Sequence, residues 1–138
     1  MSKPMRAVLT KLGLDSHEVG IKLVARYLRD AGFEVIYMGP YNTAEAIVRT
    51  VIDESADLLG FSVLTLGNHA EQVAKIMNLL KKEGADDVVV FGGGILPPED
   101  IEAWKAAGVR AVYPPGTLLP KVVEEMREAV RKQRAIAA

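Results

Sequence analysis

The sequence contains no cysteine, only 6% aromatic residues and no long apolar run. The lack of cysteine excludes disulfides, thiolate nucleophiles and cysteine metal sites, and it fits a reducing compartment. No stretch is apolar for long enough to span a bilayer, and the N-terminus lacks the apolar core of a signal peptide. The net charge is −1 with both signs spread along the chain, which indicates neither nucleic acid nor membrane as a partner. We therefore expect a cytoplasmic protein.

The length and composition are those of one globular domain. The chain has 138 residues, of which 49% are hydrophobic and 25% charged, so it can bury a core of ordinary size. No linker, repeat or low-complexity segment interrupts it. We predict a single domain over residues 1–138.

Short β-branched segments alternate with longer amphipathic segments along the chain. Strands are predicted over 5–11, 33–38, 57–62, 87–91 and 110–113. Helices are predicted over 20–31, 43–55, 69–83, 98–107 and 118–134. Five strand–helix units in a row predict an α/β fold with right-handed crossovers. The compact arrangement is a flavodoxin-like (Rossmann-like) five-stranded parallel sheet of order 2-1-3-4-5, with helices on both faces.

In such a sheet, ligands bind beyond the carboxyl ends of the strands, next to the point where the strand order reverses. The loop after the first strand places Asp15 two residues before His17, and Gly20 three residues after it. One nitrogen of an imidazole there can bind a metal, while Asp15 can accept a hydrogen bond from the other. Gly20 would let the backbone pass close to a large ligand.

The segments expected after the third, fourth and fifth strands are built from small or hydroxyl-bearing residues. They begin at Ser62, Gly92 and Tyr113, respectively. Small side chains leave room for a bulky, flat or apolar group along the edge of the sheet. The triple glycine at 92–94 fits neither the Walker A spacing nor G-x-G-x-x-G, so it does not indicate a phosphate site.

Taken together, these motifs resemble the cobalamin-binding domain of B12-dependent mutases over nearly the whole chain. The family signature is D-x-H-x-x-G, then S-x-L, then a pair of glycines, each after its strand. The matching residues here are Asp15-x-His17-x-x-Gly20, Ser62-Val63-Leu64 and Gly93-Gly94. The stretches 11–15 and 22–39 are most similar to the small subunits of acyl-CoA mutases of the methylmalonyl-CoA mutase type.

The resemblance implies adenosylcobalamin as cofactor, bound with its dimethylbenzimidazole tail detached from cobalt and buried beside the sheet. His17 would replace the tail as axial cobalt ligand, Asp15 would bind the other ring nitrogen, and Lys11 would extend this pair. No catalytic residue is implied beyond this cofactor-tuning set. The implied cofactor-binding residues are Asp15, Ser16, His17, Glu18, Val19, Gly20, Ser62, Leu64, Thr65, Gly92, Gly93, Gly94, Tyr113, Gly116 and Thr117.

The resemblance further implies a subunit that is inactive alone. A (β/α)₈ barrel that could enclose an acyl-CoA needs about 250 residues, so we expect a separate large barrel subunit to carry the substrate site. The reaction would be a radical rearrangement of an acyl-CoA of the methylmalonyl-CoA or 2-hydroxyisobutyryl-CoA type.

Departures from the family pattern keep other functions open. Acyl-CoA mutases commonly read D-G-H-D-R-G where this chain has Ser16, Glu18 and Val19, and the turn 113–117 is similar to the small subunit of glutamate mutase. The alternatives are a subunit of an amino-acid mutase, a corrinoid methyl carrier, and a cobalamin-binding sensor. A response-regulator receiver is disfavoured, because the first strand does not end in an acidic cluster.

Two further residues have expected positions. His69 should begin the third helix as a solvated or capping residue, and Trp104 should anchor the core or a subunit interface.

Overall fold

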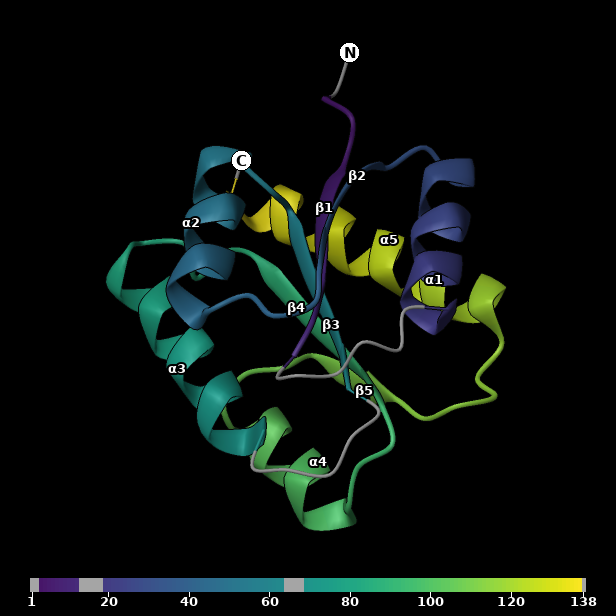
Figure 1. The fold of residues 1–138 in the computed structure, drawn as a ribbon. Coiled ribbons are helices and arrows are strands. Elements are labelled where there is room, and N and C mark those ends of the chain that lie inside the picture. Colours follow the sequence, from purple (N-terminus) through teal and green to yellow (C-terminus); the bar gives the residue numbers. More distant parts are fainter. Residues whose placement is uncertain (1–2, 13–18, 64–68, 138) are drawn as a thin grey trace.

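The computed structural model describes residues 3–12, 19–63 and 69–137. Its centre is one sheet of five parallel strands in the order β2-β1-β3-β4-β5, which confirms the flavodoxin-like prediction (Figure 1). The strands are β1 (Arg6–Lys11), β2 (Glu34–Gly39), β3 (Leu58–Val63), β4 (Val89–Gly94) and β5 (Ala111–Tyr113).

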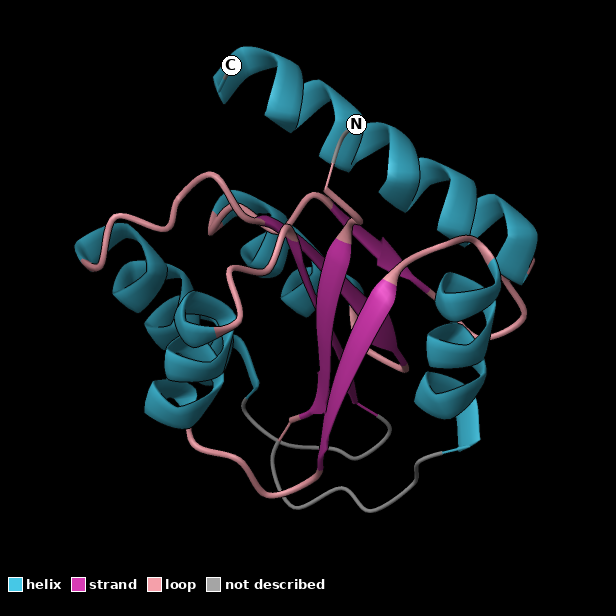
Figure 2. Ribbon diagram, turned by 90° about the horizontal axis from the view of Figure 1, so that it is seen from above, coloured by secondary structure: helices cyan, strands magenta, loops and turns pink. Residues whose placement is uncertain are grey.

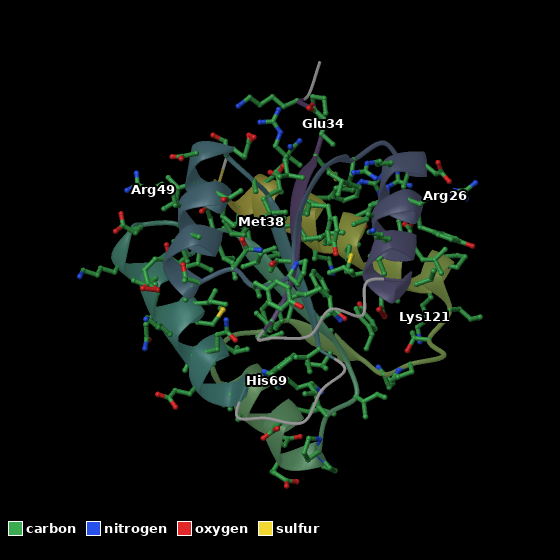
Figure 3. The ribbon with its side chains drawn as sticks, in the orientation of Figure 1. Arg26, Glu34, Met38, Arg49, His69 and Lys121 are labelled. Atoms are coloured by element: carbon green, nitrogen blue, oxygen red, sulfur yellow. The ribbon has the colours of Figure 1, made fainter. Side chains whose placement is uncertain are left out.

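Helices cover both faces of this sheet, as the strand–helix alternation predicts (Figure 2). They are α1 (Val19–Asp30), α2 (Ala44–Asp53), α3 (His69–Lys82), α4 (Pro98–Ala106) and α5 (Leu119–Ala137). Helices α1 and α5 pack on one face, and α2, α3 and α4 pack on the other. Exposed side chains such as Arg26 of α1 and Arg49 of α2 point away from the sheet (Figure 3).

The alternation of strand side chains divides the core into two clusters. Ala7 and Leu9 of β1 face α1 and α5, whereas Val8 between them faces the other three helices. The same period of two operates in β3 and β4, because successive side chains of a strand point to opposite faces. Alternate residues of each strand therefore supply the side chains that pack on each face of the sheet.

Two predicted strand ends are wrong. The third strand was expected to end at residue 62 and the fourth at 91, but β3 continues to Val63 and β4 continues through all three glycines to Gly94. The glycines stay in the sheet because Phe61, Ser62 and Val63 of β3 pair with them in register. The triple glycine that was predicted as a loop is thus the end of β4.

The amino end of the sheet is closed by Arg134 of α5. Its guanidinium donates to both carboxylate oxygens of Asp57, at 3.1 and 3.0 Å, and to the carbonyls of Lys3 and Pro4. The backbone N–H of Arg6 also donates to Asp57. This bidentate pairing fixes the end of α5 to the residues that begin β1 and β3.

Among the described residues, no helix combines the length and apolar character needed to cross a bilayer.

Candidate cofactor site

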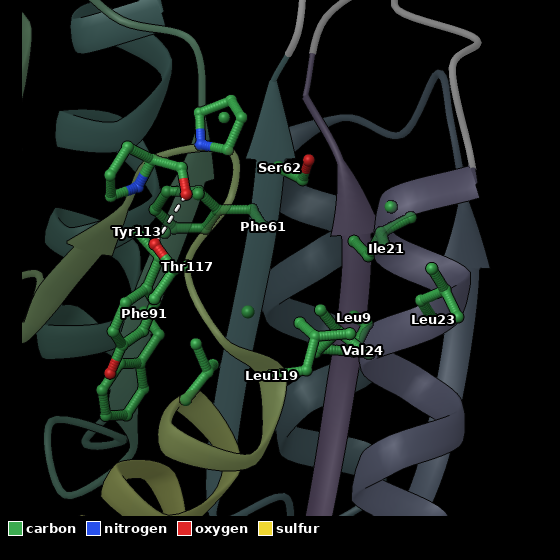
Figure 4. A pocket seen from close by; sticks show the side chains of 18 of the residues that line it. Leu9, Ile21, Leu23, Val24, Phe61, Ser62, Phe91, Tyr113, Thr117 and Leu119 are labelled. Atoms are coloured by element: carbon green, nitrogen blue, oxygen red, sulfur yellow. Dashed lines mark hydrogen bonds between the residues drawn. The ribbon is translucent and has the colours of Figure 1, made fainter.

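A pocket of about 430 Å³ opens at the carboxyl end of the sheet, between the sheet and helices α1 and α5 (Figure 4). Its size lies within the range of small-molecule sites, which are mostly apolar with a few polar groups. Strands β1, β3, β4 and β5 supply its floor, and the first turns of the two helices supply its walls. This is the position beside the reversal of strand order where the sequence predicts a ligand.

Two rows of residues across the sheet form the floor. The register aligns Lys11 with Ser62, Ser62 with Gly93, and Gly93 with Tyr113, giving an outer row nearest the pocket mouth. Two residues deeper, the inner row consists of Leu9, Gly60 and Phe91. Because Ser62 and Gly93 have little or no side chain, a hollow remains in the outer row, whereas in the inner row the Leu9 side chain lies 2.7 Å from the place of a Cβ on Gly60.

The three consecutive glycines of β4 serve three different purposes. A Cβ on Gly92 would lie 2.6 Å from Trp104 Cζ3, on the opposite side of the sheet from the pocket. A Cβ on Gly94, whose φ is +125°, would collide with the backbone carbonyl of Val63. A Cβ on Gly93 would contact only the carbonyl oxygen of Tyr113, at 3.4 Å. Gly93 is therefore the glycine of the three whose missing side chain leaves space on the pocket side.

Polar groups lie in the outer row. Lys11 is fully buried, and its Nζ donates to Ser62 Oγ at 3.3 Å. The backbone N–H of Leu12 donates to the Ser62 carbonyl, so β1 and β3 stay paired to the edge of the sheet. The buried ammonium of Lys11, held in position by this hydrogen bond, places a positive charge at the pocket floor.

The fifth strand and the turn after it close one side of the pocket. The Tyr113 ring stacks on Phe91 with centroids 6.1 Å apart, and its hydroxyl donates to Glu125 of α5 at 2.7 Å. Burial raises the pKa of Tyr113, and the hydrogen bond and charge of Glu125 raise it further, so the phenol stays neutral. Thr117 Oγ1 donates to the Pro114 carbonyl at 2.7 Å, which stabilises the turn (Figure 4).

A second organised loop lies beside β1. Asn42 Nδ2 donates to the carbonyl of Gly39 at 3.0 Å and to Thr10 Oγ1 at 3.3 Å, and Thr10 in turn donates to Gly39. These bonds hold Tyr41 at φ +67° with its side chain 59% exposed. The loop therefore supports the backbone next to Lys11, and the motif analysis did not predict it.

The predicted site residues fall into two groups. Lys11, Gly20, Ser62, Gly92, Gly93, Gly94, Tyr113, Gly116 and Thr117 all line the pocket. Asp15, Ser16, His17, Glu18, Leu64 and Thr65 lie outside the described residues, as does the side chain of Val19. Their predicted contacts with a cofactor stay predictions.

The inner walls were missed by the motif-based prediction. Val24, Leu119, Val122 and Met126 line the pocket, and Glu125 anchors Tyr113. The sequence did contain a signal for the floor. Residues two positions apart on a strand share a face. Such pairs are Leu9 and Lys11, Gly60 and Ser62, and Phe91 and Gly93. The helix residues give no such signal, because the same spacing describes any core-facing helix.

The two other residues considered are both buried. Trp104 is fully buried and meets the Phe61 ring edge to face at 5.0 Å, which confirms it as a core anchor. His69 begins α3 as expected (Figure 3), but it is only 7% exposed, so the expectation of a solvated side chain is wrong, while a capping role stays a prediction.

Residues 5–132 match the model of the B12-binding domain family. This chain belongs to that family. Two relatives of this B12-binding domain are small subunits of CoA mutases. It is 42% identical to the 2-hydroxyisobutanoyl-CoA mutase small subunit of Aquincola tertiaricarbonis, covering 96% of each chain. It is 40% identical to the pivalyl-CoA mutase small subunit of Xanthobacter autotrophicus, covering 97% of this chain and 89% of the relative.

Solved structures show the same fold. A cobalamin-binding protein from Desulfitobacterium hafniense superposes with a TM-score of 0.77 at 22% identity, over 92% of this B12-binding domain and 60% of that chain. A CheY-like receiver domain from Methanospirillum hungatei superposes with a TM-score of 0.73 at 16% identity, over 96% and 98%. Both likenesses concern the flavodoxin-like architecture, which proteins of unrelated function share.

Proposed function

We propose that this chain is the cobalamin-binding small subunit of an adenosylcobalamin-dependent acyl-CoA mutase, and that residues 1–138 act as one domain. The observation that carries the proposal is the apolar pocket at the carboxyl ends of β1, β3, β4 and β5, in a chain of the B12-binding family. The names of the two relatives add the reaction class, since both are small subunits of CoA mutases.

The described residues fit a nucleotide tail beside the sheet. Ser62 and Gly93 lack bulk beside the hollow, and a Cβ on Gly93 would contact only the Tyr113 carbonyl oxygen, at 3.4 Å, rather than the core. Tyr113 and Thr117 would border the tail from β5, and Gly20 leaves the start of α1 open, with nothing within 4 Å of a Cβ placed there. A planar apolar base requires such a slot.

The metal end would be served by the loop after β1. His17 would bind the cobalt and Asp15 would orient it, because an imidazole needs an acceptor on its second nitrogen to fix its tautomer. Lys11 lies at the end of β1, directly before that loop in the chain, and by the family resemblance it would extend the pair of His17 and Asp15. When bound, the cofactor supplies a cobalt–carbon bond that breaks homolytically, and the protein supplies placement and tuning.

The substrate would be held by another protein. Two relatives are named small subunits, which implies a large subunit, and we propose that this partner is a (β/α)₈ barrel that carries the acyl-CoA site. The acyl group is a branched one of the 2-hydroxyisobutanoyl, pivalyl or methylmalonyl type, by analogy with the relatives. A cytoplasmic location is part of the same proposal.

A spectroscopic experiment tests the cofactor assignment directly. Cob(II)alamin bound to protein labelled with ¹⁵N-histidine should give an electron paramagnetic resonance spectrum with coupling to a protein nitrogen. His17→Ala should abolish that coupling without lowering thermal stability, because loop side chains contribute little to the core. His69→Gln is the matched control and should keep it. Coupling to the benzimidazole alone would contradict the assignment.

A reconstitution experiment tests the reaction class. The isolated chain should show no turnover with adenosylcobalamin and 2-hydroxyisobutanoyl-CoA, pivalyl-CoA or methylmalonyl-CoA, and addition of its large subunit should produce turnover. Glutamate rearrangement in place of acyl-CoA rearrangement would favour an amino-acid mutase, to which the turn 113–117 is similar. Methyl transfer from methylcobalamin would favour a corrinoid carrier.

A further inference from the structure

The two ends of the pocket differ in chemistry. Lys11, Ser62, Tyr113 and Thr117 provide polar atoms, and all of them lie in the outer row or in the turn at the mouth. The inner end is walled by the side chains of Leu9, Val24, Phe91, Val122 and Met126. Among the described lining residues, none of those at the inner end has a polar side chain.

The backbone does not compensate for this lack. Around Leu9, Gly60 and Phe91 the N–H and C=O groups belong to the parallel ladders of β1, β3 and β4. Those of Val122 and Met126 lie inside α5. A polar atom placed at this end would lose its water and gain no partner, which disfavours its burial.

From this contrast we infer that the pocket selects corrinoids by the base at the end of their nucleotide tail. It accepts a benzimidazole, whose far edge carries only carbon and hydrogen, and disfavours a purine such as adenine, whose ring nitrogens and amino group would be buried without partners. This inference rests on the proposed function, since it requires the tail to occupy the pocket. Apolar pockets reject an added polar group on the order of 10- to 100-fold, and we expect a preference of that size.

Three corrinoids test the inference on the full-length chain by isothermal titration calorimetry. They are cobalamin, its analogue with adenine as the lower base, and cobinamide, which has no nucleotide base. Cobalamin should bind 10- to 100-fold more tightly than the adenine analogue, and cobinamide should bind more weakly than cobalamin. Equal affinity of cobalamin and the adenine analogue would overturn the inference but leave cobalamin binding intact. Absence of binding by all three would instead refute the proposed function.

Substitutions at the inner end then locate the selectivity. Met126 is 4% exposed on α5, and Met126→Gln places an amide of similar length there, which can pair with a purine edge. In this variant the ratio of the affinity for cobalamin to that for the adenine analogue should fall at least threefold. In the apolar control Met126→Leu the ratio should stay as in wild type. Thermal unfolding of the cofactor-free variants shows whether each still folds.

A second pair of variants tests the same inference if Met126→Gln does not fold. Leu119 begins α5, is half-buried and points into the same pocket (Figure 4). Leu119→Gln should narrow the preference in the same direction, and Leu119→Met should not. If both glutamine variants fold and the preference is unchanged, the inner end does not read the base and the inference fails.

Discussion

The two faces of the sheet differ most between residues that are neighbours in the chain. Phe61 and Gly92 face α4, where the Trp104 ring fills the space above them to within 2.6 Å of a Cβ on Gly92. Ser62 and Gly93, the next residues along β3 and β4, face the pocket of about 430 Å³. One face is packed to the density of a normal core and the other is left open at the same height.

This difference shows that adjacent glycines can be required for different structural reasons. Gly92 is small because a large core residue occupies its place, whereas Gly93 is small beside a hollow. The packed face supports the strands from behind, so that the open face can keep its shape without side chains to fill it. Variants on the packed face should therefore change stability, and variants on the open face should change binding.

The largest loss of stability is expected for Trp104→Ala on the packed face. Removing a fully buried tryptophan should cost about 3–5 kcal/mol of unfolding free energy, because it leaves a large cavity against Phe61 and Gly92. Denaturant unfolding measures this loss. Cobalamin affinity of the folded fraction should stay within about threefold of wild type. A larger fall would contradict the claim that the packed face affects stability and only the open face affects binding.

A smaller loss is expected for Gly92→Ala. The new methyl group would lie 2.6 and 2.8 Å from two carbons of Trp104, and overpacking of this kind costs about 1–3 kcal/mol. The same substitution in a Trp104→Ala background should cost less than about 0.5 kcal/mol, since the opposing ring is gone. Denaturant unfolding of all four proteins gives this double-mutant cycle. Equal costs in the two backgrounds would show that Gly92 is small for another reason.

The smallest effect is expected at the border of the open face, from Tyr113→Phe. Burial and Glu125 raise the pKa of Tyr113 above its ordinary value of 10.0, so the folded state favours the neutral phenol. The stability that this provides is present below about pH 10, the unfolded pKa, and is lost as the pH rises through the folded pKa. Wild-type stability should therefore fall relative to Tyr113→Phe in strong alkali.

Two measurements check this pH dependence. Denaturant unfolding at a series of alkaline pH values gives the difference in stability between the two proteins. The ultraviolet absorbance of tyrosinate, taken as wild type minus Tyr113→Phe, gives the titration of Tyr113 itself. A midpoint at or below pH 10 would show that burial and the contact with Glu125 do not raise the pKa of Tyr113.

The sequence predicts the architecture well because the architecture depends on local patterns. Apolar strands that alternate with amphipathic helices suffice to predict the ten elements and their order along the chain. The carboxyl edge was also predictable as the binding edge, since it follows from the order of the strands. The match of nine predicted site residues to the pocket lining reflects this rule and the family motifs.

What the sequence could not show depends on contacts between distant residues. Strand β4 runs through three glycines because β3 continues to pair with it. Glycine has a low propensity for strands, so residues 92–94 alone predict that the strand ends before them. The opposite roles of Gly92 and Gly93 depend on Trp104, which lies more than ten residues away in the chain. The bond from Tyr113 to Glu125 and the burial of His69 are tertiary facts of the same kind.

The central claim is that the open face over Gly93 holds the tail of cobalamin, and Gly93→Val tests it most directly. Valine is favoured in strands, and its Cβ would meet only the Tyr113 carbonyl oxygen, at 3.4 Å, so stability should stay within about 1 kcal/mol of wild type. Its branched side chain would fill the hollow. A calorimetric titration should show cobalamin affinity lowered at least 100-fold, with the circular dichroism spectrum unchanged. Wild-type affinity in this folded variant would contradict the account.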